Sequence, residues 1–113
     1  MKRYIKYFKE QNQLEKSFLC NYKGFDVYTV NGDYVKISYS MEFVEGGNFK
    51  VYDFVPENEI WIDNKIDKED RIPILIHEYV EVIHMLKGMD YDSAHNKANQ
   101  EEKKYREKIN ELS

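Results

Sequence analysis

The stretch R-I-P-I-L-I-H-E-Y-V-E-V-I-H-M-L, residues 71–86, is the most hydrophobic run of the sequence. Its apolar residues continue with little interruption, which predicts a helix that packs in the interior of the fold. Residues 67–70 supply acidic side chains and an N-cap, and Pro73 falls in the first turn, where its missing N–H costs nothing. Gly88 is a suitable helix stop, so we expect the helix to span residues 70–87.

Ionisable side chains interrupt this apolar helix at His77, Glu78, Glu81 and His84. Burying an unpaired carboxylate costs several kcal/mol, which is on the order of the whole stability of a small domain. These side chains therefore need partners or an ion. The alternative to an ion is a structural polar cluster, in which the histidines are hydrogen-bonded core residues and Glu78 reaches solvent.

The spacing of His77 and Glu81 places both side chains on one face of the predicted helix, one turn apart. In the H-E-x-x-H sequence of zinc hydrolases, the outer histidines bind the metal and the inner glutamate is the general base. Residues 77–81 have the form H-E-x-x-E, and a carboxylate oxygen can take the place of the second imidazole. We therefore expect His77 and Glu81 to bind a metal and Glu78 to act as the catalytic base.

The third ligand has two candidates. His95 lies early in the next predicted helix, and a short antiparallel connection would bring it opposite residues 77–81. His84, one turn beyond Glu81, is its rival. Glu102 shares the face of His95 and is a candidate for a fourth ligand or for a partner of an imidazole N–H. Zinc is the favoured ion, and iron or manganese would also suit a carboxylate-containing site.

The fold class predicted from the rest of the chain is α+β. Residues 91–112 carry an apolar stripe at helical spacing after a candidate N-cap, Asp90, which predicts a C-terminal two-helix hairpin. Residues 17–63 alternate between apolar and polar side chains, which predicts a small antiparallel or mixed sheet of four or five strands in meander order. Asn31-Gly32 predicts a hairpin turn within it. The predicted strands are 24–30, 33–44, 49–55 and 59–63.

Length and composition limit the classes of protein. A chain of 113 residues with 42% hydrophobic and 34% charged residues predicts one domain, 1–113. The net charge of −4 gives no reason to expect nucleic-acid or membrane binding. A single cysteine, Cys20, fits a reducing cytoplasm. Residues 1–16 lack the features of a signal peptide, and we expect them to form a short helix or a loosely attached arm.

Several motifs resemble a known group of proteins. H-E-x-x-E is followed by G-M-x-Y-x-x-A-H-x-x-A-x-x-x-E and preceded by F-x-E-G-G and P-E-N-E-I-W-I-D. This pattern resembles small uncharacterised proteins of bacteria, archaea and their viruses that are similar to minimal zincins. The resemblance covers about residues 22–106. It implies His77, Glu81 and His95 as ligands and Glu78 as base, with the strand at 59–63 and the Gly46-Gly47 loop beside the metal.

The expected function is a metal-dependent hydrolase of zincin type, either a peptidase or an amide hydrolase, acting on an unknown peptide or protein. Tyr79, Tyr91 and Tyr105 are candidates for donors to the oxyanion. The alternative is a non-catalytic interaction protein, such as a viral or mobile-element accessory factor. In that case the His/Glu cluster would be structural or would hold a structural metal.

Overall fold

The computed structural model describes residues 13–112, so the helix or arm expected in residues 1–16 lies almost entirely outside the described residues. The described part confirms the α+β class: a four-stranded mixed sheet is followed by a C-terminal two-helix hairpin. The strands are β1 (Ser17–Tyr22), β2 (Phe25–Val30), β3 (Gly46–Asn48) and β4 (Glu59–Asp63). The helices lying wholly within it are α2 (Gly32–Ser38), α3 (Lys68–Leu86) and α4 (Tyr91–Leu112).

The strand order in the sheet is β1-β2-β4-β3. β1 and β2 form an antiparallel hairpin, β2 and β4 are parallel, and β3 pairs antiparallel with β4 at the edge. The expected meander is therefore wrong, because the chain crosses from β2 to the far edge before it returns through β4. The tight turn of the sheet is Lys23-Gly24, whose φ angles of 49° and 94° suit a two-residue hairpin.

The hairpin turn predicted at Asn31-Gly32 is wrong. Asn31 is instead the N-cap of α2, and its side chain accepts a hydrogen bond from the backbone N–H of Tyr34. Gly32 is required for a close approach rather than for a turn, since a Cβ there would lie 2.2 Å from the carboxylate of Asp63. The Gly32 N–H donates to that carboxylate. Asparagine favours both turns and N-caps, and tertiary contacts select the cap.

Two predicted strands are absent from the described residues. The run 33–44 contains α2 and a turn, and the run 49–55 consists of turns whose first bonds are donated by Val51 and Tyr52 to the carbonyl of Asn48. Both runs still bury apolar side chains, as the predicted alternation required. Their aromatic residues fill a second core beneath α2, so packing satisfies the hydrophobic pattern without strand pairing.

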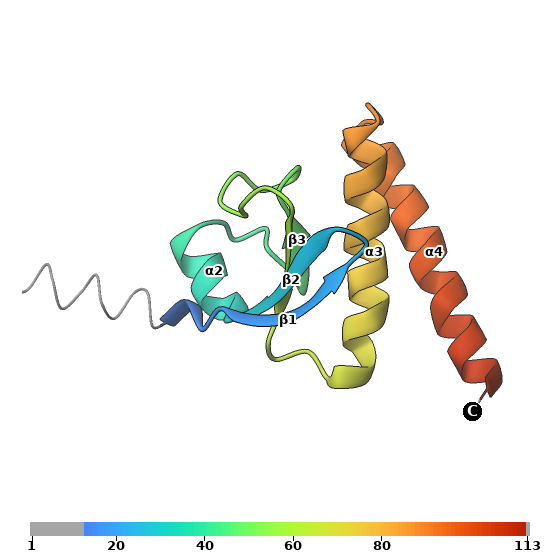
Figure 1. Cartoon of the computed structure of the whole chain (residues 1–113), viewed down its shortest axis with the longest axis horizontal. Coiled ribbons are helices and arrows are strands. Elements are labelled where there is room, and N and C mark those ends of the chain that lie inside the picture. Colours follow the sequence, from blue (N-terminus) through green and yellow to red (C-terminus); the bar gives the residue numbers. More distant parts are fainter. Residues whose placement is uncertain (1–12, 113) are drawn as a thin grey trace, which may run out of the picture.

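Hydrophobic residues on the two faces of the sheet form separate cores. The core against α3 consists of Phe25, Val27, Ile60, Ile62, Ile74, Leu75 and Val82. The core on the α2 side consists of Val30, Val35, Phe43, Val55 and Trp61. Figure 1 shows the sheet between α2 and α3, with α4 packed along the outer side of α3. The helices α3 and α4 thus form a layer over one face of the sheet, and none of the helices in the described part is long and apolar enough to cross a membrane.

The ends of the two long helices follow most of the sequence signals. α3 begins at Lys68, so Pro73 lies in its second turn and not in the first. Gly88, with φ of 100°, ends α3 as predicted. The N–H groups of Gly88 and Met89 donate to the carbonyls of Met85 and His84, which forms a Schellman motif. The next helix, α4, begins at Tyr91, and this short connection brings α4 back along α3.

β3 lies close to α3 because its first residue has no side chain. A Cβ at Gly46 would lie 2.9 Å from the backbone oxygen of Trp61 and 3.2 Å from Ile74 Cγ2. Either contact would push β3 away from β4 or from α3. The sequence Gly46-Gly47 is therefore part of a strand and not a plain loop. The close packing of β3 on α3 places Asn48, the residue after Gly47, against the buried face of α3.

A candidate metal centre in the interhelical cleft

A cleft of about 430 Å³ runs between α3, the start of α4 and the segment around β3. Carboxylate, imidazole and tyrosine side chains lie along it, together with a few apolar residues. The residues that line the cleft are Glu42, Val44, Glu45, Gly46, Val51, Tyr52, Ile74, His77, Glu78, Glu81, Tyr91, His95, Asn99 and Glu102. All of the sequence-predicted site residues except His84 are among them.

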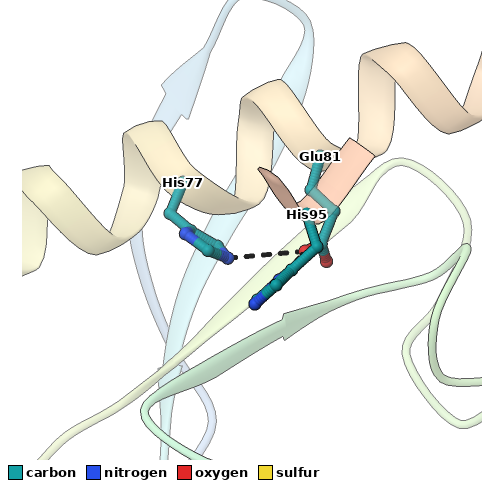
Figure 2. A group of neighbouring side chains, drawn as sticks. All are labelled: His77, Glu81 and His95. Carbon is teal, nitrogen blue, oxygen red and sulfur yellow. Dashed lines mark hydrogen bonds and ion pairs between the residues drawn. The ribbon is translucent and has the colours of Figure 1, made fainter. Parts of the chain in front are cut away.

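The donor atoms of His77, Glu81 and His95 lie within 4.8 Å of one another (Figure 2). Glu81 Oε2 is 3.4 Å from His77 Nε2 and 2.7 Å from His95 Nδ1. Two ligands of a tetrahedral zinc with bonds of about 2.0–2.2 Å lie about 3.3–3.5 Å apart. The first pair already has this spacing, and the second would open by less than about 1 Å to admit an ion. The three side chains could therefore hold a metal ion as a His-Glu-His ligand set.

The helices bring these groups together for simple geometric reasons. His77 and Glu81 are four residues apart on α3, so their side chains lie on one face. His95 comes from the first turns of α4, next to Ala94, which is fully buried. Ala98, one turn further, is also fully buried. These small side chains let α4 approach α3 closely, so that the His95 ring reaches the carboxylate of Glu81.

The carboxyl group of Glu81 is 3% exposed and is held in the charged form. Burial alone would raise its pKa. Hydrogen bonds and charge interactions with His77 and His95 outweigh burial and lower the pKa below the usual value. A deprotonated carboxylate facing two imidazoles is the state that a divalent metal ion requires.

Glu78 has the opposite electrostatic character, although it is only three residues away on the same helix. Burial, and then the neighbouring charge of Glu81, raise its pKa from 4.5 to about 7. His77 and a hydrogen bond from Asn48 oppose this shift without cancelling it. A carboxyl group that titrates near neutral pH can both take up and return a proton, as a general base needs to do.

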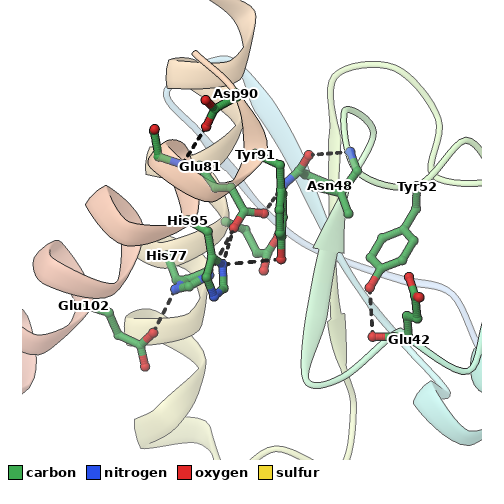
Figure 3. A network of polar contacts seen from close by, with 12 residues as sticks. Glu42, Asn48, Tyr52, His77, Glu81, Asp90, Tyr91, His95 and Glu102 are labelled. Atoms are coloured by element: carbon green, nitrogen blue, oxygen red, sulfur yellow. Dashed lines mark hydrogen bonds and ion pairs between the residues drawn. The ribbon is translucent and has the colours of Figure 1, made fainter.

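Glu102 lies behind the imidazole of His77, where its Oε1 is 3.0 Å from Nδ1 (Figure 3). This distance permits an ion pair, but the two groups lack the alignment of a hydrogen bond, and Nδ1 is a buried nitrogen without a hydrogen-bond partner among the described residues. The geometry favours an electrostatic contact over a formed hydrogen bond. Burial lowers the pKa of His77, and Glu81, Glu78 and Glu102 together raise it above its usual value. Arg106 binds the other oxygen of Glu102 at 3.0 Å and thereby fixes that side chain.

His84 is not part of this cluster. Its Nδ1 lies 2.8 Å from the carbonyl oxygen of Val80 and donates to it within α3, outside the residues lining the cleft. The structure therefore places His95, and not His84, beside the other two donor groups.

Of the three tyrosines expected as donors, Tyr91 lines the cleft. Its ring stacks on that of His95, with centroids 5.3 Å apart. Tyr79 packs edge-on against Tyr22 and Phe25 on the core side of α3. Neither Tyr79 nor Tyr105 is among the residues lining the cleft.

Sequence reasoning missed Tyr52, which lines the cleft, and Asn48, which contacts two of the carboxylates that line it. The Tyr52 hydroxyl donates to the carbonyl of Glu42 at 2.9 Å, and burial and the charge of Glu78 raise its pKa to about 12. Asn48 is completely buried and donates to both Glu78 and Glu81. The only sequence signal for Asn48 was its place directly after Gly46-Gly47, and that segment was predicted to be a loop.

No known family model matches the chain, and no curated protein or solved structure is significantly similar to it.

Proposed function

We propose that this protein is a metal-dependent hydrolase of the zincin type that cleaves amide bonds in peptides or proteins. The observation that carries the proposal is the juxtaposition of His77, Glu81 and His95 with the buried Glu78 along one cleft. Three protein ligands leave a fourth position for water or substrate, as in catalytic zinc sites. Zinc is the ion that suits two nitrogens and one oxygen best, and iron or manganese would also accept them.

The bound metal would supply Lewis acidity, which polarises a substrate carbonyl and lowers the pKa of a water molecule. Glu78 would accept the proton of the attacking water and return it to the leaving amine as the amide C–N bond breaks. Tyr91 lies along the same cleft, and its hydroxyl is the candidate donor to a developing oxyanion.

The first test is metal content together with hydrolysis. Protein purified without an affinity tag should contain about one divalent ion per chain and should cleave members of a peptide library. Glu78→Gln should retain the metal and lose about 10²-fold or more of the cleavage rate. Glu101→Gln, the same chemical change at an exposed carboxylate of α4 that does not line the cleft, is the control and should keep the rate. A chain without stoichiometric metal, or a Glu78→Gln variant with an undiminished rate, contradicts the proposal.

The second candidate function is a non-catalytic interaction or accessory protein in which these side chains are a structural cluster. One observation favours it: His95 Nδ1 and Glu81 Oε2 are 2.7 Å apart, the spacing of a hydrogen bond and not of two ligands on one ion. In that case chelators would change neither the metal content nor the melting temperature. The same purified protein therefore separates the two candidates.

A further inference from the structure

A single buried amide, that of Asn48, joins the two carboxylates of the cleft. Its Nδ2 donates to Glu78 Oε1 at 3.0 Å and to Glu81 Oε1 at 3.1 Å (Figure 3). An amide nitrogen has two hydrogens, and each of them is directed to one carboxylate. Asn48 comes from the edge strand β3 and is completely buried, so no water competes for these bonds.

The orientation of this amide is fixed from the other side. Its Oδ1 accepts hydrogen bonds from the backbone N–H groups of Lys50 at 3.0 Å and Val51 at 3.2 Å. A flipped amide would place its nitrogen against two N–H donors and its oxygen against two carboxylates, so only one orientation satisfies all four contacts. The turn after β3 therefore holds the donor end of Asn48 against α3.

The consequence for Glu81 is that its two oxygens have different partners. Oε1 accepts from Asn48, and Oε2 faces both His77 and His95. Glu78 is restrained by the same nitrogen through its own Oε1. We propose that Asn48 is a positioning residue: it makes Glu81 a ligand through one oxygen only, and it keeps Glu78 out of the coordination sphere, where Glu78 can act as a base.

This inference rests on the proposed metal site, and cobalt(II) in place of the native ion tests the two separately. Four-coordinate cobalt(II) absorbs visible light more strongly than five- or six-coordinate cobalt(II), so absorbance reports the number of ligands. Asn48→Asp keeps an oxygen that can accept from Lys50 and Val51 and removes both donors. We expect the cobalt form of this variant to lose about half or more of its visible molar absorbance, as Glu81 and Glu78 add oxygens to the ion.

The matched control is Asn21→Asp. Asn21 also accepts from a backbone N–H, that of Gly24, and donates from Nδ2 to a carboxylate, that of Asp26, but it lies in the exposed β1–β2 hairpin. This variant should keep the cobalt spectrum of the unaltered protein. Asn48→Ala removes the same donors without adding a negative charge, and its cobalt form should also lose absorbance. It takes the place of Asn48→Asp if that variant does not fold.

Folded Asn48→Asp and Asn48→Ala variants with the unaltered cobalt spectrum would overturn the role of Asn48 and leave the metal site intact. Failure of the unaltered protein to bind cobalt at all would overturn the metal site and, with it, the role of Asn48. The positioning role is supported only if the control keeps its spectrum while the Asn48 variants lose theirs.

Discussion

Glu78 and Glu81 have the same side chain and lie one helical turn apart, yet their surroundings favour opposite protonation states. His77 and His95 hold the pKa of Glu81 low against the effect of burial, whereas burial and the charge of Glu81 raise the pKa of Glu78 to about 7. Two titratable groups whose pKa values are pushed apart in this way suit two different roles. At the scale of the residue, this difference separates the candidate ligand from the candidate base.

The raised pKa of Glu78 predicts a pH dependence of stability in the metal-free protein. The usual pKa is 4.5 and the folded value is about 7, so the folded protein keeps a proton that the unfolded chain loses. The contribution of this proton to the free energy of unfolding is fully present below the usual pKa and is lost as the pH rises through the folded value. Once Glu78 is fully deprotonated, the free energy of unfolding is lower by about 3 kcal/mol. Glu78→Gln, which cannot deprotonate, should lack this loss.

Urea unfolding of both proteins in the presence of chelator, from pH 5 to about 8, measures the difference. The stability of the Glu78→Gln variant relative to the unaltered protein should grow over this range. Glu101→Gln is the control, because Glu101 is an exposed carboxylate on α4 whose side chain is paired only with Lys104 among the described residues. Parallel pH profiles for the unaltered protein and Glu78→Gln would show that Glu78 is charged in the folded state throughout.

At the scale of the element, the start of α4 determines where His95 lies. Asp90, five residues before His95 in the chain, caps this helix. Its Oδ1 accepts a hydrogen bond from the backbone N–H of Ser93 at 2.8 Å. That hydrogen bond lowers the pKa of Asp90 below its usual value. The cap therefore stabilises the first turn of α4 in the charged state of Asp90.

We predict that Asp90→Ala lowers the melting temperature by a few degrees at neutral pH, because the first turn loses its cap. A group with a lowered pKa contributes stability above its usual pKa and loses that contribution as the pH falls through the folded value. The difference between the two proteins should therefore shrink in acid. Asp92→Ala, a neighbouring change inside the first turn of α4, is the control for the loss of a negative charge near the helix start. Equal effects of the two substitutions would assign the stabilisation to the helix dipole alone.

The sequence predicted the helical elements well and the middle of the sheet poorly. α3 and α4 are long and periodic, and Gly88 and Asp90 mark their ends by local chemistry that needs no distant contact. Asn31-Gly32 failed as a turn because the choice between hairpin and N-cap depends on Asp63, which is distant in sequence. Sheet pairing between β2 and β4 is a non-local contact of the same kind.

The candidate site was predictable in part for the same reason. His77, Glu78 and Glu81 lie within one helix, so their relative positions follow from the helical repeat. His95 could be expected from a short helix connection. Asn48 could not, because it is brought to α3 by a three-residue edge strand whose two glycines allow close packing. Tertiary placement of this kind leaves no periodic signal in the sequence.

At the scale of the whole molecule, the candidate ligands come from both helices of the C-terminal hairpin. His77 and Glu81 belong to α3, which covers the sheet, and His95 belongs to α4, which packs on α3 (Figure 1). The unfolded chain cannot assemble these three groups, so an ion that binds them stabilises the folded state. Metal binding should therefore change the stability of the entire α+β unit and not only the order of one loop.

This coupling predicts that zinc raises the melting temperature of the metal-free protein. At a free concentration about 100 times the dissociation constant, the added stability is about 2.7 kcal/mol. His95→Gln should lose most of this increase, because only two ligands are left. His84→Gln is the matched control: His84 belongs to the same short set of three histidines, but its Nδ1 lies against the carbonyl of Val80 and it does not line the cleft. Thermal scans with and without chelator measure both variants. An equal loss of the zinc effect in the two variants would mean that zinc binds the chain through some other arrangement of its histidines.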